Sequence, residues 1–156
     1  MKKTYLFLGL GVLAFALYSK YKVFWDNLRL SVGKVKLRAL PPYTSFDIVI
    51  TINAINPTKT IITLNSVMGD LLIQGKTIAK ISGGSVILNQ GKKSFDVFAT
   101  IGVDEIVNLT GLKFDKSNIG AFIKQLVEEP FTTNLTFDTS LGRFSSKDNW
   151  KISDYA

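Results

Sequence analysis

The chain has 156 residues with 19 Lys and Arg against 12 Asp and Glu, and it contains neither Cys nor His. Without cysteine there are no disulfides, thiol nucleophiles or cysteine-linked lipids, and without histidine the usual zinc and haem ligands and the imidazole base of hydrolases are missing. The net charge of +7 does not indicate nucleic-acid binding, because four lysines precede residue 24 and leave fifteen basic and twelve acidic residues after it.

The uncharged, apolar segment at residues 4–19 has lysines on both sides and predicts a membrane anchor. A helix of this length spans about 24 Å, and continuation to Trp25 adds roughly 9 Å, enough to cross a hydrocarbon layer about 30 Å thick. The residues predicted to lie in the bilayer are Tyr5, Leu6, Phe7, Leu8, Leu10, Val12, Leu13, Phe15, Leu17 and Tyr18. Those predicted to lie at the headgroups, as snorkelling lysines and belt aromatics, are Lys2, Lys3, Lys20, Tyr21, Lys22 and Trp25.

A cleaved signal peptide is the competing interpretation of the same segment. Lys2 and Lys3 would form its basic region, residues 5–13 its apolar core, and residues 14–16 an A-x-A-like cleavage site. Large residues follow that site and the interfacial aromatics continue beyond it, which favours a retained anchor. We therefore divide the chain into an anchor or uncleaved signal at 1–25 and one β-domain at 26–156.

The first strand is predicted at residues 27–40, where Leu28, Leu30 and Val32 alternate with polar residues. Gly33 breaks the alternation, and Val35 and Leu37 resume it in the opposite phase, which indicates a glycine bulge. Pro41-Pro42 ends the strand. Its basic residues are predicted to meet anionic headgroups rather than nucleic acid, and they are Arg29, Lys34, Lys36 and Arg38.

Residues 45–56 give the clearest strand pattern in the chain, with apolar residues at every second position from Phe46 to Ala54. Asn56-Pro57 then predicts a turn, because proline disfavours the α region for the residue before it and asparagine tolerates turn geometry. A long strand bent at Gly69-Asp70, or two short strands, is predicted for residues 61–73.

Further strands follow between turn signals, and together they predict the fold class. Turns are expected at residues 74–76 and 89–92, and a last irregular strand around Gly142; the intervening strands are expected at residues 77–81, 86–88, 95–101 and 131–137. Seven or eight short strands with regularly spaced turns predict a mainly β protein, an antiparallel β-sandwich of immunoglobulin or fibronectin type.

Two helices interrupt the strands. Asp104 is predicted to cap a short helix through Leu109, closed by Gly111. Residues 117–129 place apolar side chains at i, i+3, i+4, i+7 and i+8, so an amphipathic helix is predicted, ending before Pro130. We expect this inserted helix to cover an open edge or end of the sheets.

The stretch ITINAINPTKTIITLNSVMGDLLIQGKTIAKI at residues 50–81 resembles the late embryogenesis abundant (LEA) type 2, or WHy, family. Asn56-Pro57 matches the family's Asn-Pro pair, and Gly75 matches the glycine of its following hairpin. The resemblance implies a small β-sandwich without an active site, behind an anchor or signal sequence, with binding or stabilising roles in desiccation and stress. The helix at 117–129 and the last strand lie beyond the matched part.

No catalytic, cofactor-binding or metal-binding residue is predicted. Asp104-Glu105 and Glu128-Glu129 fit helix ends better than a paired-carboxylate site, and no phosphate-binding or calcium-binding loop is present. The leading hypothesis is a non-enzymatic, single-pass membrane protein whose β-domain binds or stabilises a protein partner, or a second copy, next to the lipid bilayer. No nucleic acid or small-molecule substrate is indicated.

Two other hypotheses remain open. The chain could be a structural component of a membrane-containing assembly, such as a virion with an internal lipid layer or an envelope complex. The chain could also be an enzyme, which is the least supported of the three hypotheses. Whichever function it has, the protein would be secreted or periplasmic if the leading segment were cleaved.

Overall fold

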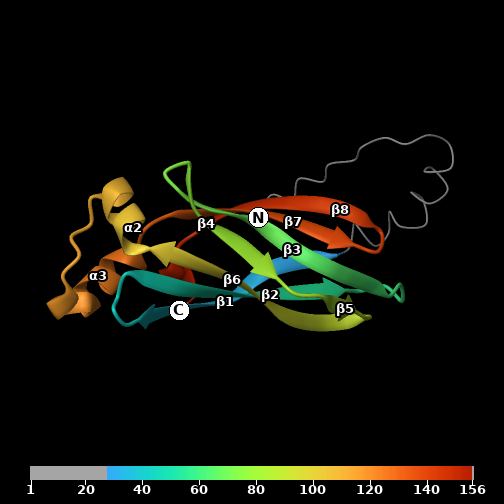
Figure 1. Ribbon diagram of the computed structural model, residues 1–156. Coiled ribbons are helices and arrows are strands. Elements are labelled where there is room, and N and C mark those ends of the chain that lie inside the picture. Colours follow the sequence, from blue (N-terminus) through green and yellow to red (C-terminus); the bar gives the residue numbers. More distant parts are fainter. Residues whose placement is uncertain (1–27, 156) are drawn as a thin grey trace.

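The computed structural model describes residues 28–155 (Figure 1). The predicted anchor residues and the headgroup residues that flank them, Lys2, Lys3, Lys20, Tyr21, Lys22 and Trp25, fall outside this part. The described strands are β1 (Arg29–Leu40), β2 (Ser45–Asn56), β3 (Ile62–Ile73), β4 (Lys76–Gly83), β5 (Val86–Leu88), β6 (Gly91–Gly102), β7 (Phe131–Thr139) and β8 (Gly142–Trp150). The helices are α2 (Val103–Thr110) and α3 (Ile119–Leu126), with 3-10 turns η1 (Lys116–Asn118) and η2 (Ile152–Asp154).

The strands form one antiparallel sheet in the order β1-β2-β6-β4-β3-β7-β8, with β5 paired to β3. The mainly β, antiparallel class is therefore confirmed, but the predicted pair of separate sheets is replaced by one sheet that curls over itself. The curl joins β4 to β6 through only two register pairs, Ser82 with Phe98 and Gly83 with Val97. A Cβ on Gly83 would lie 2.8 Å from a methyl of Val97, so glycine allows this close crossing.

Strand β1 contains the predicted bulge, because its register against β2 shifts between Val32 and Lys34. Pro41-Pro42 follows the strand, as predicted, and the peptide bond between the two prolines is cis. Strand β2 has the predicted bounds and buries every second residue from Phe46 to Asn56. The alternation in these two strands was strong enough to give their inward faces, both ends of β2 and the last residue of β1, which starts at Arg29 rather than at residue 27.

Strand β3 is one long strand, the first of the two predicted alternatives, and Gly69-Asp70 does not divide it. Both residues stay in register with β4 and β7, and a Cβ on Gly69 would collide with the backbone carbonyl of Asn134 on β7. The glycine thus marks the close approach of a neighbouring strand. The irregularities of β3 lie elsewhere, between Leu64 and Ser66 against β7 and between Leu71 and Leu72 against β4.

The first predicted helix is present as α2, but Asp104 does not cap it. Gly102 occupies the N-cap position without a side-chain bond, and Asp104 lies in the first turn, where a carboxylate faces the positive end of the helix dipole. Gly111 ends the helix in the left-handed conformation, with φ of 70° and its N–H 2.9 Å from the carbonyl oxygen of Val107.

The second helix is shorter than predicted. Asp115 caps η1 and Asn118 caps α3 by accepting from the Ala121 N–H, so the segment is split before the helix starts. Phe122 and Leu126 are buried, and the Phe122 ring stacks on Phe46 with centroids 5.6 Å apart. The helix therefore covers one end of the sheet, as expected (Figure 1).

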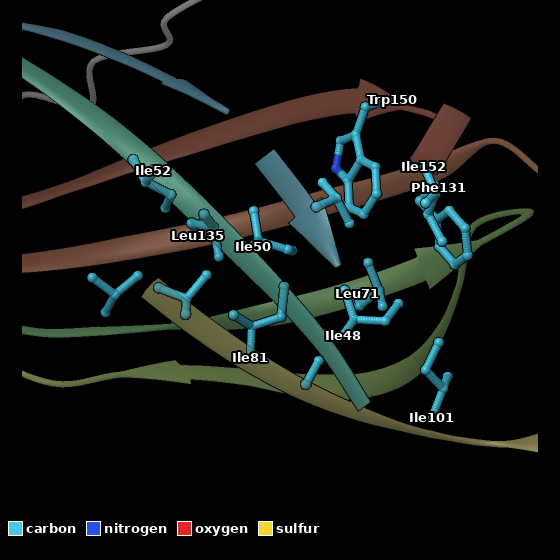
Figure 2. Close-up of a cluster of buried hydrophobic side chains, with 14 of the residues drawn as sticks. Ile48, Ile50, Ile52, Leu71, Ile81, Ile101, Phe131, Leu135, Trp150 and Ile152 are labelled. Carbon is cyan, nitrogen blue, oxygen red and sulfur yellow. The ribbon is translucent and has the colours of Figure 1, made fainter. Parts of the chain in front are cut away.

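The core lies between the two halves of the curled sheet. Figure 2 shows side chains from β2, β3, β4, β6, β7 and β8 converging there, with the ring of Trp150 beside them. The Trp150 ring stacks on Phe131 at 5.2 Å, and its Nε1 donates to Thr133 Oγ1 at 3.3 Å, which satisfies the buried indole. Within residues 28–155, no helix has the length and apolar character needed to cross a bilayer.

Candidate functional site

The basic residues of β1 gather on one outward side of the edge strand, and we call this set the basic face: Arg29, Lys34, Lys36 and Arg38. All four side chains are exposed, and none forms an ion pair within residues 28–155. The bulge at Gly33 creates the set, because without it Arg29 and Lys34 would lie on opposite sides of the strand. The basic residues predicted to meet headgroups are therefore brought together by the fold.

Two carboxylates lie on the same outward side, on the neighbouring strands β2 and β6. Asp47 accepts a hydrogen bond from the Thr100 hydroxyl at 2.9 Å, and Asp96 accepts one from the Thr51 hydroxyl at 2.6 Å. With Lys92 of β6, the outward side of β1, β2 and β6 carries five cations and two anions. This side of the molecule is consequently positive.

In the part of the chain that the structure describes, four large apolar side chains are exposed, and sequence reasoning missed them. They are Ile61 at 65 %, Met68 at 61 %, Ile87 at 52 % and Phe98 at 52 % exposure. Phe98 is in register with Val49 of β2, which is in register with Lys36 of the basic face. The signal was available, since Phe98 shares its strand phase with Asp96 and Thr100 and so had to point outward.

The residues of the family turn motif are not brought together into a site. Asn56 and Pro57 precede β3, whereas Gly75 follows it, in a hairpin where Gln74 and Gly75 have φ values of 51° and 77°. Both predicted turns are formed. Because the twelve residues of β3 separate them, each acts in its own turn rather than in a shared binding site.

Asn56 is buried and uses both ends of its amide. Its Nδ2 donates to the carbonyl oxygens of Thr60 at 2.8 Å and Leu88 at 3.3 Å. Its Oδ1 accepts from the Thr58 N–H at 3.0 Å and the Thr58 hydroxyl at 2.7 Å. The side chain ties the end of β2 to β5 and shapes the turn after Pro57, which is a role in folding.

The adjacent acidic pairs lie apart from the basic face. Asp104 and Glu105 are exposed in the first turn of α2, and Glu128 follows α3, with its carboxylate 3.9 Å from Lys151 Nζ. Among residues 28–155, no three Asp or Glu side chains lie together as a metal-ligand group.

No protein-family model matches the chain, and no curated protein matches it. Similar solved structures include a protein from Archaeoglobus fulgidus, with 9 % identity over 80 % of this chain and 94 % of that one, at a TM-score of 0.45. A candidate LEA protein is similar at 16 % identity over 89 % of this chain and 80 % of that one, TM-score 0.46. A FixG-related protein from Vibrio parahaemolyticus shows 13 % identity over 81 % and 96 %, TM-score 0.42. At these TM-scores the similarities carry no conclusion about function.

Proposed function

We propose that this chain is a non-enzymatic, single-pass membrane protein whose β-domain binds or stabilises a protein partner next to the bilayer, in the manner of an LEA type 2 or WHy domain. The observation that carries the proposal is the junction between the two parts. The uncharged segment at 4–19 leads within ten residues into β1, whose exposed cations share one side of the strand. A domain tethered by that segment would hold those cations close to the headgroups.

The family part of the proposal rests on the two turns. The Asn-Pro turn and the glycine hairpin that carry the resemblance are both formed, at the two ends of β3. The Asn56 side chain explains why an asparagine precedes the proline, since it supplies two donors and an acceptor that the turn uses.

Mass spectrometry of the mature protein tests the anchor. The chain is isolated from its native membrane or particle, and its intact mass is measured. A chain that retains its leading segment and stays with the lipid after alkaline carbonate washing supports the proposal. A chain that starts near Leu17 would be a soluble exported domain and would refute it.

Thermal aggregation of a client enzyme tests the stabilising role. The chain in detergent is added to an enzyme that is then heated or dried, and the retained activity is compared with that after addition of an unrelated β-protein. Protection by this chain alone supports the proposal. Purification of the chain as a stoichiometric part of a large particle would favour the assembly hypothesis instead.

A further inference from the structure

We infer that the outward side of β1, β2 and β6 lies flat against an anionic phospholipid surface, with Lys34, Lys36 and Arg38 at the headgroup phosphates and Phe98 at the boundary of the acyl chains. This inference deepens the proposed function, because it names the surface by which the domain meets the bilayer. Its test nevertheless gives a result whether or not the tether is retained.

The spacing of the basic face requires the flat orientation. Arg29 and Arg38 are nine residues apart on an extended strand, which separates them by roughly 30 Å. Electrostatic attraction in physiological salt decays over about 8 Å. If β1 stood upright from the membrane, only its first cation would feel the headgroups. All four can contact phosphates together only when the strand lies parallel to the surface.

Charge identifies lipid as the occupant of this side. The four cations of the basic face form no ion pair within residues 28–155, although Arg38 is in register with Asp47, so a phosphate layer can pair with them without breaking an existing ion pair. The two carboxylates on this side are already hydrogen-bonded to threonine hydroxyls. The edge strand is also the one joined to residue 27, beyond which the apolar segment lies.

Phe98 adds an apolar contact to the same side. It lies two strands from Lys36, about 10 Å away, at the same level of the sheet. Val49 lies between them and is half-buried. Cations beside an exposed aromatic ring suit the interface of an anionic bilayer, where the phosphates pair with the cations and the ring enters the boundary region.

Lysine and arginine on an edge strand also discourage pairing with other strands, and that role would explain the charges alone. It does not require the charges to share one side, nor an exposed phenylalanine in register with them. The two explanations predict different effects of lipid charge. Protection of the edge does not depend on the charge of the lipid, whereas contact with headgroups requires anionic lipid.

The test uses the full chain in lipid nanodiscs made of phosphatidylcholine alone or mixed with phosphatidylserine. The chain has no cysteine, so Phe98→Cys and, as its matched control, Ile87→Cys each give one site for an environment-sensitive NBD dye. Both native side chains are 52 % exposed. We expect the emission of NBD at position 98 to shift to the blue and to be quenched by nitroxide lipids on the anionic discs only. The emission of NBD at position 87 should remain that of the dye in water on both kinds of disc.

Charge variants then assign the contact to the basic face. Lys34→Gln, Lys36→Gln and Arg38→Gln are combined in the chain labelled at position 98. Each cation near an anionic surface contributes about fivefold, so the triple change shifts the contact equilibrium on the order of 100-fold and returns the emission to its value on neutral discs. Lys76→Gln, Arg143→Gln and Lys147→Gln remove the same charges elsewhere and should leave the emission unchanged.

Each outcome bears on the inference separately from the tether. If the chain stays with both kinds of disc but position 98 remains in water, the inference is wrong and the tether stands. If the chain leaves neutral discs, the tether in the proposed function is refuted. The inference is still supported if the chain then stays on anionic discs and the variant changed at Lys34, Lys36 and Arg38 does not. A blue shift on neutral discs that grows with protein per disc indicates contact between copies and overturns it.

Discussion

Replacing Asn56 by alanine should destabilise the domain more than any other single loss of a polar side chain in the described part. Asn56 is 1 % exposed and makes four hydrogen bonds, to two carbonyl oxygens and to the backbone and side chain of Thr58. Alanine removes both donors. The buried carbonyl of Leu88 then loses this hydrogen bond, and the partly buried carbonyl of Thr60 bonds to water instead.

The magnitude follows from these partners. An unpaired buried acceptor costs about 1–3 kcal/mol, and each half-exposed bond to Thr58 or Thr60 contributes about 0.5–1 kcal/mol. We therefore expect Asn56→Ala to lower the free energy of unfolding by about 3 kcal/mol, a large share of the 5–15 kcal/mol typical of a domain. The assay is urea unfolding of the full chain in neutral detergent, followed by circular dichroism of the β-sheet.

Asn53→Ala is the matched control, because Asn53 lies on the same strand and makes one exposed hydrogen bond, from the Ser94 hydroxyl at 2.7 Å. Its effect should stay within about 0.5 kcal/mol. Equal destabilisation by the two variants would contradict the reasoning. It would mean that the four hydrogen bonds of the Asn56 side chain add no more stability than the one exposed hydrogen bond of Asn53.

The aspartate variant at the same position gives a diagnostic pH dependence. In Asn56→Asp, a carboxylate would face two carbonyl oxygens in place of the donating Nδ2, so its pKa in the folded state should rise above the unfolded value of about 3.9. The folded state then binds the extra proton, and stability falls as pH rises through this range. Asn56→Asp should thus be less destabilising near about pH 4 than near about pH 7, whereas Asn56→Ala should show no such difference.

Three further variants test other parts of the fold. Gly69→Ala should lower the melting temperature by roughly 10 °C or more, because a Cβ there collides with the backbone of β7, whereas Gly84→Ala, with open space around it, should change it little. Phe122→Ala should cost about 3–5 kcal/mol in urea unfolding, because the ring is buried at the end of the sheet that α3 covers. The hydroxyl and the N–H of Ser117 donate to Asp115 and hold the pKa of its carboxyl below 3.8; an NMR titration should show that pKa rising in Ser117→Ala. Because the pKa is lowered on folding, the stability that Asp115 adds is present above its unfolded pKa and is lost as pH falls through the folded one.

Local pattern predicted most of the strands. The alternation in β2 gave its bounds, and the phase change at Gly33 gave the bulge in β1, because side-chain period and burial are coupled within one strand. The hairpin at Gly75 followed from glycine chemistry in the same local way. Helix ends were less predictable, since Asn118 and Asp115 both had capping character and only the structure shows that both are used.

Contacts between distant strands could not be predicted. The junction of β4 and β6 consists of two register pairs, and no local pattern indicates which strands meet or that Gly83 leaves room for Val97. Gly69 looked like a strand break because the strand that needs its missing side chain, β7, lies more than sixty residues later in the chain. A glycine within a strand indicates either the close approach of a neighbouring strand or a bend, and only the tertiary structure shows which of the two applies.

The bulge at Gly33 links the fold to the proposed surface. Before it, odd-numbered residues of β1 point outward; after it, even-numbered residues do, which turns Lys34, Lys36 and Arg38 to the side of Arg29 while Val35 still enters the core. A continuous strand with this sequence would place either the cations or the apolar residues on the wrong side, at a large cost in stability. One glycine in an edge strand thus allows the same segment to complete the core and to collect four exposed cations on one face. A segment of this design suits a domain whose first strand must pack inward and meet a charged surface outward.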